Sequence, residues 1–325
     1  MCGFVGYINK NIDQVDPSMI KKMMDLQRHR GPDDAGLALL SSEENSSISY
    51  DQNDLKNLDT RNNYHNYNWG IGFNRLSVID TSKNGHQPMS NKEKSIYIMF
   101  NGEIYNAFEL KKELISSNYN FKSKTDTEII LILYEMFGLE YTLQKLNGMF
   151  TICILDLKKK KIFLARDRFG IKPLYYIFNE DFFSFSSEIK SFLAIKNFKF
   201  ILNKKHLSEY FIFKYLAFPN TLIHGVNLLQ PGQIIEYDNH QIKKTTYFDF
   251  KNFVIKKDTE NKKLITLEKK LEQSIKNQLM SDVNLGCQLS GGIDSSLITF
   301  FAKKYSKKIE TFSILFNEKN LTEET

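Results

Sequence analysis

The sequence predicts a layered α+β fold in its first part, followed by the beginning of an α/β nucleotide-binding domain. Short β-type runs recur with only two helical stretches among them, near 108–117 and 126–137, so strands and helices do not alternate regularly. After residue 200 the pattern changes, and it ends in a strand, a glycine turn and a helix. A length of 325 residues also favours two domains, which we place at residues 1–200 and 201–325.

The N-terminal elements follow from apolar periodicity and from capping residues. An apolar, strand-like run extends from Cys2 to Ile8. Asp16-Pro17 opens a helix, and Gly31-Pro32 lies just past its basic end. Residues 41–68 are rich in Ser, Asn, Asp and Glu, so we expect a surface excursion there. The later strands of the first domain are expected at 69–73, 95–100, 150–157, 161–166, 174–178 and 182–186.

The remaining elements are less regular. The lysine run from Lys158 to Lys161 separates two apolar strands and predicts a solvated hairpin turn. Further along the chain we expect a helix near 206–216, a hairpin at 233–248, a charged helix at 259–280, a strand at 283–289, a helix from Leu297 and a strand at 311–314.

Composition narrows the class of protein. The net charge is +6, from 44 Lys and Arg against 38 Asp and Glu, but the basic residues are dispersed and no basic-aromatic patch predicts nucleic acid as a partner. Because a signal-like N-terminus and a run of about 20 apolar residues are both absent, no membrane is expected either. Cys2, Cys153 and Cys287 give no disulfide framework, which predicts a cytoplasmic protein. We expect Cys153 and Cys287 to be small buried side chains.

Cys2 is the most informative single residue. If Met1 is cleaved, one terminal residue carries both a thiol and an α-amine. A deprotonated thiol is a strong nucleophile and a free α-amine titrates near neutrality, so this residue would supply both nucleophile and base. A cysteine at position 2 also occurs by chance, and the rest of the chain must decide.

A second candidate site follows the predicted strand at 283–289. The segment Ser290-Gly291-Gly292-Ile293-Asp294-Ser295-Ser296 combines glycines, hydroxyls and a helix start, a pattern that favours phosphate oxygens. Asp294 would hold Mg²⁺ against the phosphates. The alternative is a serine-glycine turn that only caps a helix. The segment is neither a GxxxxGK[ST] nor a GxGxxG motif, and it resembles the PP-loop of ATP pyrophosphatases.

Four further motifs occur between these sites, and together with Cys2 they resemble class II glutamine amidotransferases. The motifs are Arg30-Gly31-Pro32-Asp33-Asp34, Arg75-Leu76-Ser77-Val78-Ile79-Asp80, Asn101-Gly102-Glu103-Ile104-Tyr105-Asn106 and Ala165-Arg166-Asp167-Arg168-Phe169-Gly170. With the PP-loop downstream, the whole chain resembles glutamine-hydrolysing asparagine synthetases. The resemblance implies an N-terminal nucleophile-type αββα sandwich, followed by the start of a PP-loop domain.

The resemblance also implies roles for individual residues. Cys2 would attack the glutamine amide, and Asn101 and Gly102 would form the oxyanion hole. Arg75 and Asp126 would hold the α-carboxylate and α-ammonium of glutamine. The remaining residues of the glutamine pocket would be Leu76, Val78 and Glu103. In the second domain, adenine would lie between Leu289 and Ile314, and the phosphates would contact Ser290, Gly291, Gly292, Asp294, Ser295 and Ser296.

Considered without the resemblance, several of these residues have simpler explanations. Asn101-Gly102 is typical of a type I′ hairpin turn. Arg75 is explained as a surface arginine at a strand end, and Asp126 as part of a helix cap, since Thr125 and Glu128 have capping-box spacing. Arg166-Asp167-Arg168 and the turn from Phe169 to Leu174 are expected to be structural, with the charged residues in an ion network.

The expected activity is glutamine-dependent asparagine synthesis, in which ATP·Mg²⁺ adenylylates aspartate and ammonia displaces AMP. The partners are therefore glutamine, aspartate and ATP, with a homodimer left open. Because family members continue well beyond Thr325, we expect a truncated synthetase domain, and the acceptor site cannot be assigned from this sequence. Three alternatives follow: an amidotransferase with a different carboxylate acceptor, a stand-alone glutaminase, or a non-catalytic nucleotide-binding subunit.

Overall fold

The computed structural model describes residues 1–11, 14–58, 66–116, 119–196, 198–252, 259–306 and 308–314. The chain forms two compact units, Met1–Phe250 and Lys251–Thr325. The first unit therefore continues past residue 200, where the sequence analysis places the domain boundary. The reason is non-local strand pairing, because Ile234 of a late hairpin lies opposite Ala165 in the same sheet.

Two antiparallel sheets form the first unit. The first has the strand order β11-β9-β10-β1-β4-β2-β3 and the second β13-β12-β8-β7-β6-β5. The strands of the first sheet are β1 Gly3–Asn9, β2 Asp34–Ser41, β3 Ser46–Tyr50, β4 Trp69–Arg75, β9 Tyr175–Phe178, β10 Phe182–Ser186 and β11 Asn227–Leu228. Those of the second are β5 Met89–Ser90, β6 Ile96–Ile104, β7 Gly148–Asp156, β8 Lys161–Arg166, β12 Gln233–Asp238 and β13 Gln241–Thr246.

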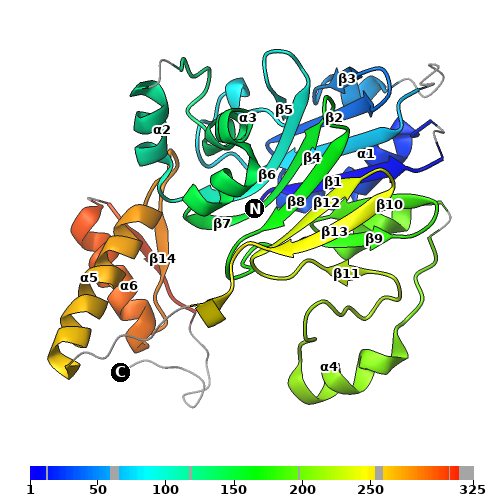
Figure 1. The fold of residues 1–325 in the computed structure, drawn as a ribbon. Helices are drawn as coiled ribbons and strands as arrows, with labels where there is room; N and C mark the ends of the chain where they lie inside the picture. Colours follow the sequence, from blue (N-terminus) through cyan, green and yellow to red (C-terminus); the bar gives the residue numbers. More distant parts are fainter. Residues whose placement is uncertain are drawn as a thin grey trace. The chain divides into compact units, whose positions relative to one another are not determined.

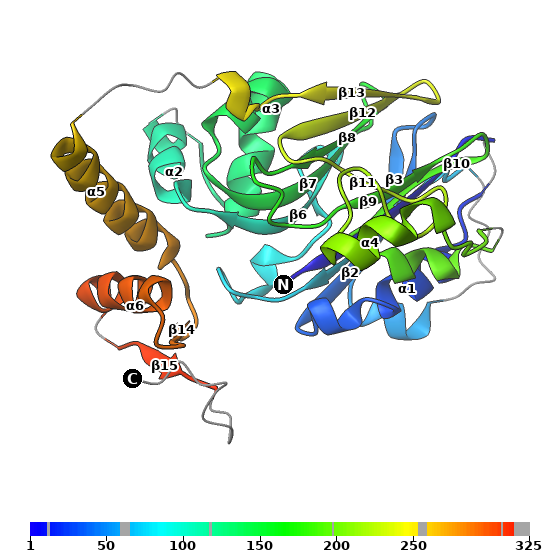
Figure 2. The same ribbon diagram turned by 90° about the horizontal axis from the view of Figure 1, so that it is seen from below.

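Four helices complete the first unit: α1 Pro17–Asp25, α2 Ala107–Ser116, α3 Asp126–Lys145 and α4 Leu207–Phe213. Side chains of α1, such as Ile20 and Met23, pack with Val5 and Leu37 on the outer face of the first sheet. α3 packs on β6 and β5 of the second sheet. Figures 1 and 2 show α3 and α1 on opposite outer faces of the sheets. The predicted αββα layering is confirmed.

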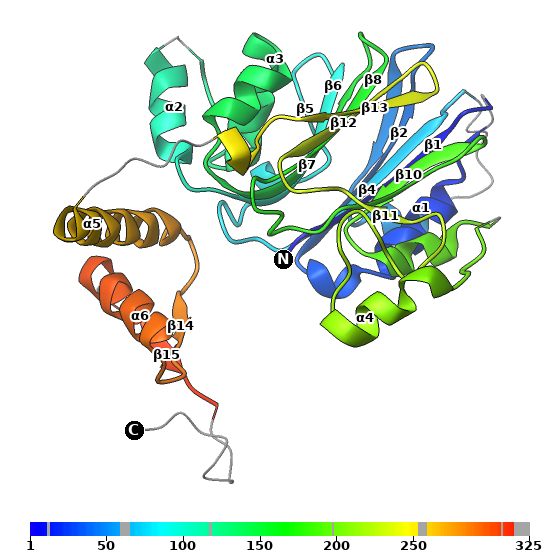
Figure 3. The same cartoon turned by 60° about the horizontal axis from the view of Figure 1, so that its bottom comes forward.

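The main core lies between the two sheets, which are seen stacked in Figure 3. Phe4, Trp69 and Phe73 of the first sheet belong to the same buried cluster as Cys153 and Leu164 of the second. Alternate residues of each strand point to this interior, as the period of a strand requires. The layer is therefore filled, and the functional groups lie at the strand ends.

Most predicted elements of the first unit are confirmed. Asp16 caps α1, where its Oδ1 accepts a hydrogen bond from the Ser18 N–H at 2.8 Å. The lysine run forms the turn between β7 and β8, with Lys158 paired to Glu93 in solvent. The surface excursion at 41–68 is partly wrong, because β3 pairs with β2 within it. β3 is a polar edge strand, so it lacks an apolar pattern. Residues 59–65 of the excursion lie outside the described residues.

The second unit contains α5 Glu260–Gln278, β14 Gly286–Gln288, α6 Ile293–Tyr305 and β15 Glu310–Phe312. β14 and β15 pair in parallel on either side of α6 in the chain. The predicted helix starts earlier than Leu297, because Ile293–Ser296 form its first turn. Cys287 is half-buried, so its predicted burial is only partial, whereas Cys153 is fully buried.

Candidate active site

One cavity of about 210 Å³ brings together all eight residues predicted for glutamine chemistry. Its volume corresponds to about seven water molecules, which suits a small polar ligand. Both sheets and the start of α3 contribute. The predicted residues that line it are Cys2, Arg75, Leu76, Val78, Asn101, Gly102, Glu103 and Asp126. Residues far apart in sequence therefore meet at the ends of β1, β4 and β6.

Cys2 lies directly before β1, and its thiol is held by the chain that leaves β4. Its Sγ accepts a hydrogen bond from the Leu76 N–H at 3.3 Å and lies 3.5 Å from the Leu76 carbonyl oxygen. Burial raises the pKa of the Cys2 thiol, while the Leu76 N–H and the nearby terminal ammonium act in the opposite direction. Arg30 fixes the main chain, since its Nε donates to the Cys2 carbonyl oxygen at 2.9 Å.

β6 presents two hydrogen-bond donors beside the thiol. The Asn101 Nδ2 is buried without a hydrogen-bond partner among the described residues. The N–H groups of Phe100 and Ile104 point away from β7, to Gln87 Oε1 at 2.7 Å and Asp126 Oδ2 at 3.1 Å. Because backbone directions alternate along a strand, the N–H of Gly102 between them faces the same side. Two donors aimed at one cavity can stabilise a negatively charged oxygen.

The interpretation of Asn101-Gly102 as a hairpin turn is wrong. Both residues lie inside β6, opposite Thr151 and Phe150 of β7. A side chain at Gly102 would place its Cβ 2.2 Å from the Met149 carbonyl oxygen, so close strand packing explains the glycine. A nine-residue strand pairing overrides the local turn propensity of an Asn-Gly pair.

Arg75 is a buried cation, not a surface arginine, with 5% of its area exposed. Its guanidinium donates to the carbonyl oxygens of Ser82 at 2.9 Å and Ile79 at 3.1 Å, and also to that of Asp80. A Cβ at Gly85 would lie 1.9 Å from the Arg75 Nη2, so only glycine leaves room for the guanidinium. The loop is thus wrapped around one positive charge at the cavity wall.

Two carboxylates, Asp126 and Glu103, line the same cavity. Burial, together with the Glu103 carboxylate, raises the pKa of Asp126 to about 7, although the Ile104 N–H opposes the shift. Burial also raises the pKa of Glu103, with Lys172 acting against it. Asp126 is the first residue of α3, and the Thr125 Oγ1 before it caps the helix by accepting from the Glu128 N–H at 3.3 Å. Two adjacent residues thus have different roles: Thr125 caps the helix and Asp126 lines the cavity.

Sequence reasoning missed several lining residues, above all Lys172 and Gln87. Lys172 lies in the turn that was expected to be only structural. The sequence analysis expects Arg166 and Asp167 to take part in an ion network. Instead, their side chains form hydrogen bonds with backbone groups of the turn. A buried lysine in a turn carries no local sequence signal.

In the second unit, the predicted phosphate segment forms the turn between β14 and α6. Gly291 has φ +92°, a conformation that glycine adopts without strain. The Ser295 Oγ accepts from the Ser290 N–H at 3.3 Å and donates to the Gly292 carbonyl oxygen at 3.0 Å. Gly292 caps α6, with Asp294 and Ser296 in its first turn. This arrangement is a helix N-terminus at the end of a parallel strand, which suits an anion.

The other predicted ATP-binding residues lie next to this turn. Leu289 directly follows β14, and its N–H donates to the Phe312 carbonyl oxygen at 2.9 Å. Ile314 follows β15 and is 80% exposed. Within the described part of the chain, no group of three or more His, Cys, Asp and Glu side chains is arranged to hold a metal ion. A Mg²⁺ at the exposed Asp294 would therefore depend on phosphate oxygens for its other ligands, as is usual for this ion.

Comparison with known proteins decides the family. A family model described as a glutamine amidotransferase domain matches residues 41–248. The chain belongs to the glutamine amidotransferase family. This membership confirms the resemblance inferred from the motifs. A second model, described as asparagine synthase, matches residues 266–325 of this chain, which include the predicted PP-loop.

Relatives with curated names extend the match over nearly the whole chain. Asparagine synthetase [glutamine-hydrolyzing] 1 of Bacillus subtilis is 36% identical over 99% of this chain and 47% of its own length. A putative asparagine synthetase [glutamine-hydrolyzing] 2 of Methanocaldococcus jannaschii is 36% identical over 98% of this chain and 60% of its own. This glutamine amidotransferase chain therefore spans about half the length of the curated relatives it matches.

A solved structure supports the fold. Glutamine phosphoribosylpyrophosphate amidotransferase from B. subtilis superposes with a TM-score of 0.58 at 16% identity, over 96% of this chain and 65% of that chain. At this identity the similarity concerns the fold alone. It supports the predicted sandwich of two sheets between outer helices. In the described residues, no helix of this glutamine amidotransferase is long and apolar enough to cross a membrane.

Proposed function

We propose that the chain hydrolyses glutamine at Cys2 and supplies the ammonia to an ATP-dependent synthesis of asparagine. The observation that carries this proposal is a cavity in which a half-buried thiol, the Asn101 amide and the Gly102 backbone of β6, a buried guanidinium and a buried carboxylate all meet. Family membership and the names of the relatives support the same conclusion.

Hydrolysis begins with attack of the Cys2 sulfur on the glutamine side-chain carbonyl carbon. The thiol proton passes to the terminal amine, which belongs to Cys2 itself once Met1 is removed. The carbonyl oxygen becomes negative and accepts hydrogen bonds from the Asn101 Nδ2 and the Gly102 N–H. The carbon–nitrogen bond then breaks, and the same proton leaves with ammonia. Water hydrolyses the γ-glutamyl thioester to glutamate and restores the thiol.

The two buried charges define the substrate. Arg75 pairs with the α-carboxylate of glutamine, and Asp126 accepts the α-ammonium. Since an isolated buried charge is costly, each site favours a ligand that brings the opposite charge. Leu76 and Val78 provide apolar contacts for the side-chain methylenes, and Glu103 is the third polar group on this wall. A free amino acid with a terminal amide satisfies all of these groups.

The second unit is proposed to bind ATP as a substrate through Ser290, Gly291, Gly292, Asp294, Ser295 and Ser296, with Leu289 and Ile314 near adenine. Mg²⁺ at Asp294 would neutralise phosphate charge. Aspartate is the proposed acceptor, and adenylylation of its side-chain carboxylate prepares it for displacement by ammonia. A cytoplasmic location and a homodimer remain predictions.

The test is NMR with glutamine labelled with ¹⁵N in its amide, in the presence of ATP, Mg²⁺ and aspartate. We expect labelled ammonia in every case, and labelled asparagine if the chain carries both half-reactions. Label in ammonia alone would restrict the function to glutamine hydrolysis. Unchanged glutamine, in a protein whose mass shows that Met1 is absent, would contradict the proposal. The Cys2→Ser variant is the matched control.

A further inference from the structure

Lys172 is a buried lysine whose place in the structure is not explained by packing alone. Only 6% of its area is exposed, and it lines the same cavity as Cys2 and Glu103. Among the described residues, its ammonium makes no hydrogen bond or ion pair. Burying a lysine without a partner is unfavourable, so a position of this kind points to a function.

The motif that contains Lys172 is bent so as to deliver this side chain. The Asp167 Oδ2 accepts from the Lys172 N–H at 3.1 Å, and the Arg166 Nε donates to the Lys172 carbonyl oxygen at 2.7 Å. Both of these charged side chains are buried. Hydrogen bonds thus hold both the N–H and the carbonyl oxygen of Lys172, and they fix the direction of its side chain into the cavity.

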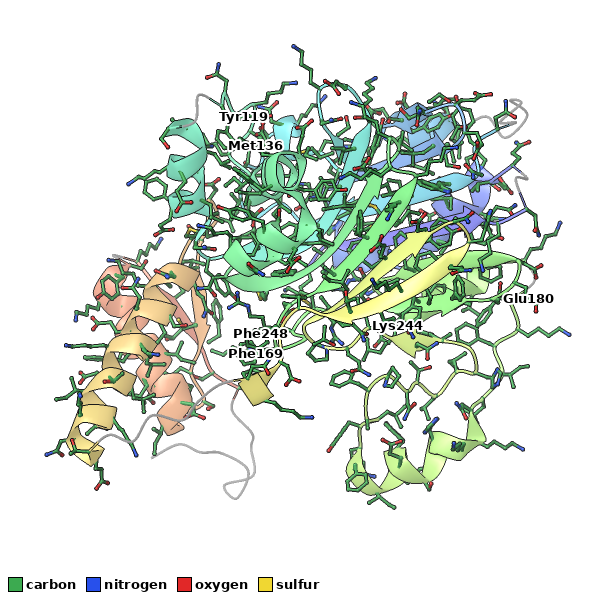
Figure 4. The ribbon with its side chains drawn as sticks, in the orientation of Figure 1. Tyr119, Met136, Phe169, Glu180, Lys244 and Phe248 are labelled. Atoms are coloured by element: carbon green, nitrogen blue, oxygen red, sulfur yellow. The ribbon has the colours of Figure 1, made fainter. Side chains whose placement is uncertain are left out.

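The rest of the turn reinforces this clamp. Gly170 has φ +67°, which allows the sharp bend, and Arg166 also donates to its carbonyl oxygen. On the outer side, the Phe169 ring packs on Phe250, with ring centroids 5.2 Å apart. Figure 4 shows Phe169 beside Phe248 at this end of the unit. The motif is therefore a support, held by several hydrogen bonds, that places Lys172 at the cavity.

Several titratable or charged groups face Lys172 from the surrounding elements. They are the terminal amine of Met1, Cys2, Arg30, Glu103 and Asp167. Arg75 and Asp126 line the same cavity. Lys172 exerts the largest opposing charge effect on the pKa of Glu103, and Glu103 does the same for Lys172. The lysine and Arg30 also lower the pKa of the terminal amine, although burial is the main cause.

We propose that Lys172 is an electrostatic positioning residue of the Cys2 site, which acts on Glu103 and on the amine that Cys2 carries once Met1 is removed. This inference rests on the proposed glutamine hydrolysis. A cation beside a carboxylate favours its ionised form, and the same cation beside an amine disfavours protonation. The proposed hydrolysis requires a neutral amine as its base, and Glu103 lines the wall of the same cavity. Lys172 therefore acts through its neighbours and need not contact the substrate.

The sign of the effect is the same for both neighbours. Without the cation, Glu103 and the amine each need a higher pH to lose a proton. For Lys172→Met we expect the acidic limb of the kcat/KM profile for glutamine to move up by about one pH unit. At pH 6 the loss is about tenfold, and at pH 9 the activity returns to within about twofold of wild type. Lys172→Arg, which keeps the charge, should leave the acidic limb near its original position.

Lys158→Met is the matched control, because Lys158 lies on an exposed hairpin turn. It removes the same charge from the chain and should leave the profile unchanged. If Lys172→Met destabilises the fold, Lys172→Gln provides a second neutral variant. An acidic limb at the same pH in wild type and in a folded neutral variant would overturn the proposal. An equal shift in Lys172→Arg would do the same.

A second measurement needs no turnover of glutamine. The pH titration of the Glu103 carboxyl, followed by the ¹³C chemical shift of its side chain, reports on the proton of this group directly. We expect its midpoint to rise in Lys172→Met and to remain near wild type in Lys172→Arg and Lys158→Met. If wild type releases no ammonia from glutamine, the proposed function fails, while this shift still decides the part played by Lys172. An unchanged midpoint for Glu103 in a folded neutral variant overturns the inference.

Discussion

Asp126→Asn should stabilise the free protein while weakening its use of glutamine. In the structure, burial raises the pKa of Asp126 to about 7 from an ordinary value of 3.8. The folded state therefore holds this proton more tightly than the unfolded state does. Stability is lost as pH rises from about 4 to about 7, because the folded protein must then either keep a proton that water would take or bury a charge.

The magnitude follows from the two pKa values. A difference of about 3 units corresponds to about 4 kcal/mol of free energy of unfolding, fully lost above about pH 8. Between pH 5 and pH 8 the loss is about 2.5 kcal/mol. Asparagine has nearly the same shape and cannot ionise, so this part of the pH dependence should be absent from the variant. Its kcat/KM for glutamine should fall by about 10- to 100-fold, as expected when a charged hydrogen-bond partner is lost.

The assay is urea unfolding followed by the fluorescence of Trp69, the only tryptophan in the chain. Trp69 is buried in the core between the two sheets and reports on the first unit. We expect the stability of Asp126→Asn relative to wild type to increase by about 2.5 kcal/mol between pH 5 and pH 8. A difference between the two proteins that is the same at both pH values would refute the reasoning.

The remaining predictions concern the other walls of the cavity and the phosphate turn. Gly85→Ala places a Cβ 1.9 Å from the Arg75 Nη2, so KM for glutamine should rise at least about tenfold in steady-state assays, whereas the exposed neighbour Asn84→Ala should have little effect. Asn101→Ala removes a donor to the developing oxyanion, so kcat should fall about 100- to 1000-fold with a small change in KM. If KM rose by this factor while kcat did not change, Asn101 would contribute only to substrate binding. Gly291→Ala forces a side chain into φ +92° and should weaken ATP binding measured by calorimetry, and unchanged affinity would argue against the phosphate assignment.

The sequence predicts the layers of the fold well because their signals are local. The Asp16 cap and the apolar runs of β6 and β7 each follow from a few neighbouring residues. The edge strand β3 was missed because its polar residues show no apolar period. The extent of the first unit was also missed, since the pairing of Ile234 with Ala165 joins segments about 70 residues apart. Pairing between strands so far apart in the sequence produces no pattern within a short segment of the chain.

The predicted site residues were found through motifs and not through their local propensity. Considered by local propensity alone, Asn101-Gly102 is a turn and Arg75 a surface residue, and the structure contradicts both. The sequence analysis assigned Lys172 to a structural turn. What distinguishes this lysine is its burial in the cavity that Glu103 also lines. That fact depends on how Arg166 and Asp167 fold the turn back, which becomes visible only in three dimensions.

The central claim is that Cys2 is the nucleophile, and the most direct test is to trap its covalent intermediate. The protein would be mixed with glutamine, quenched rapidly in acid and digested, and the peptides that contain Cys2, Cys153 and Cys287 would be weighed by mass spectrometry. The account predicts a γ-glutamyl thioester on Cys2 alone. Release of ammonia with no adduct on Cys2, or an adduct on another cysteine instead, would contradict it.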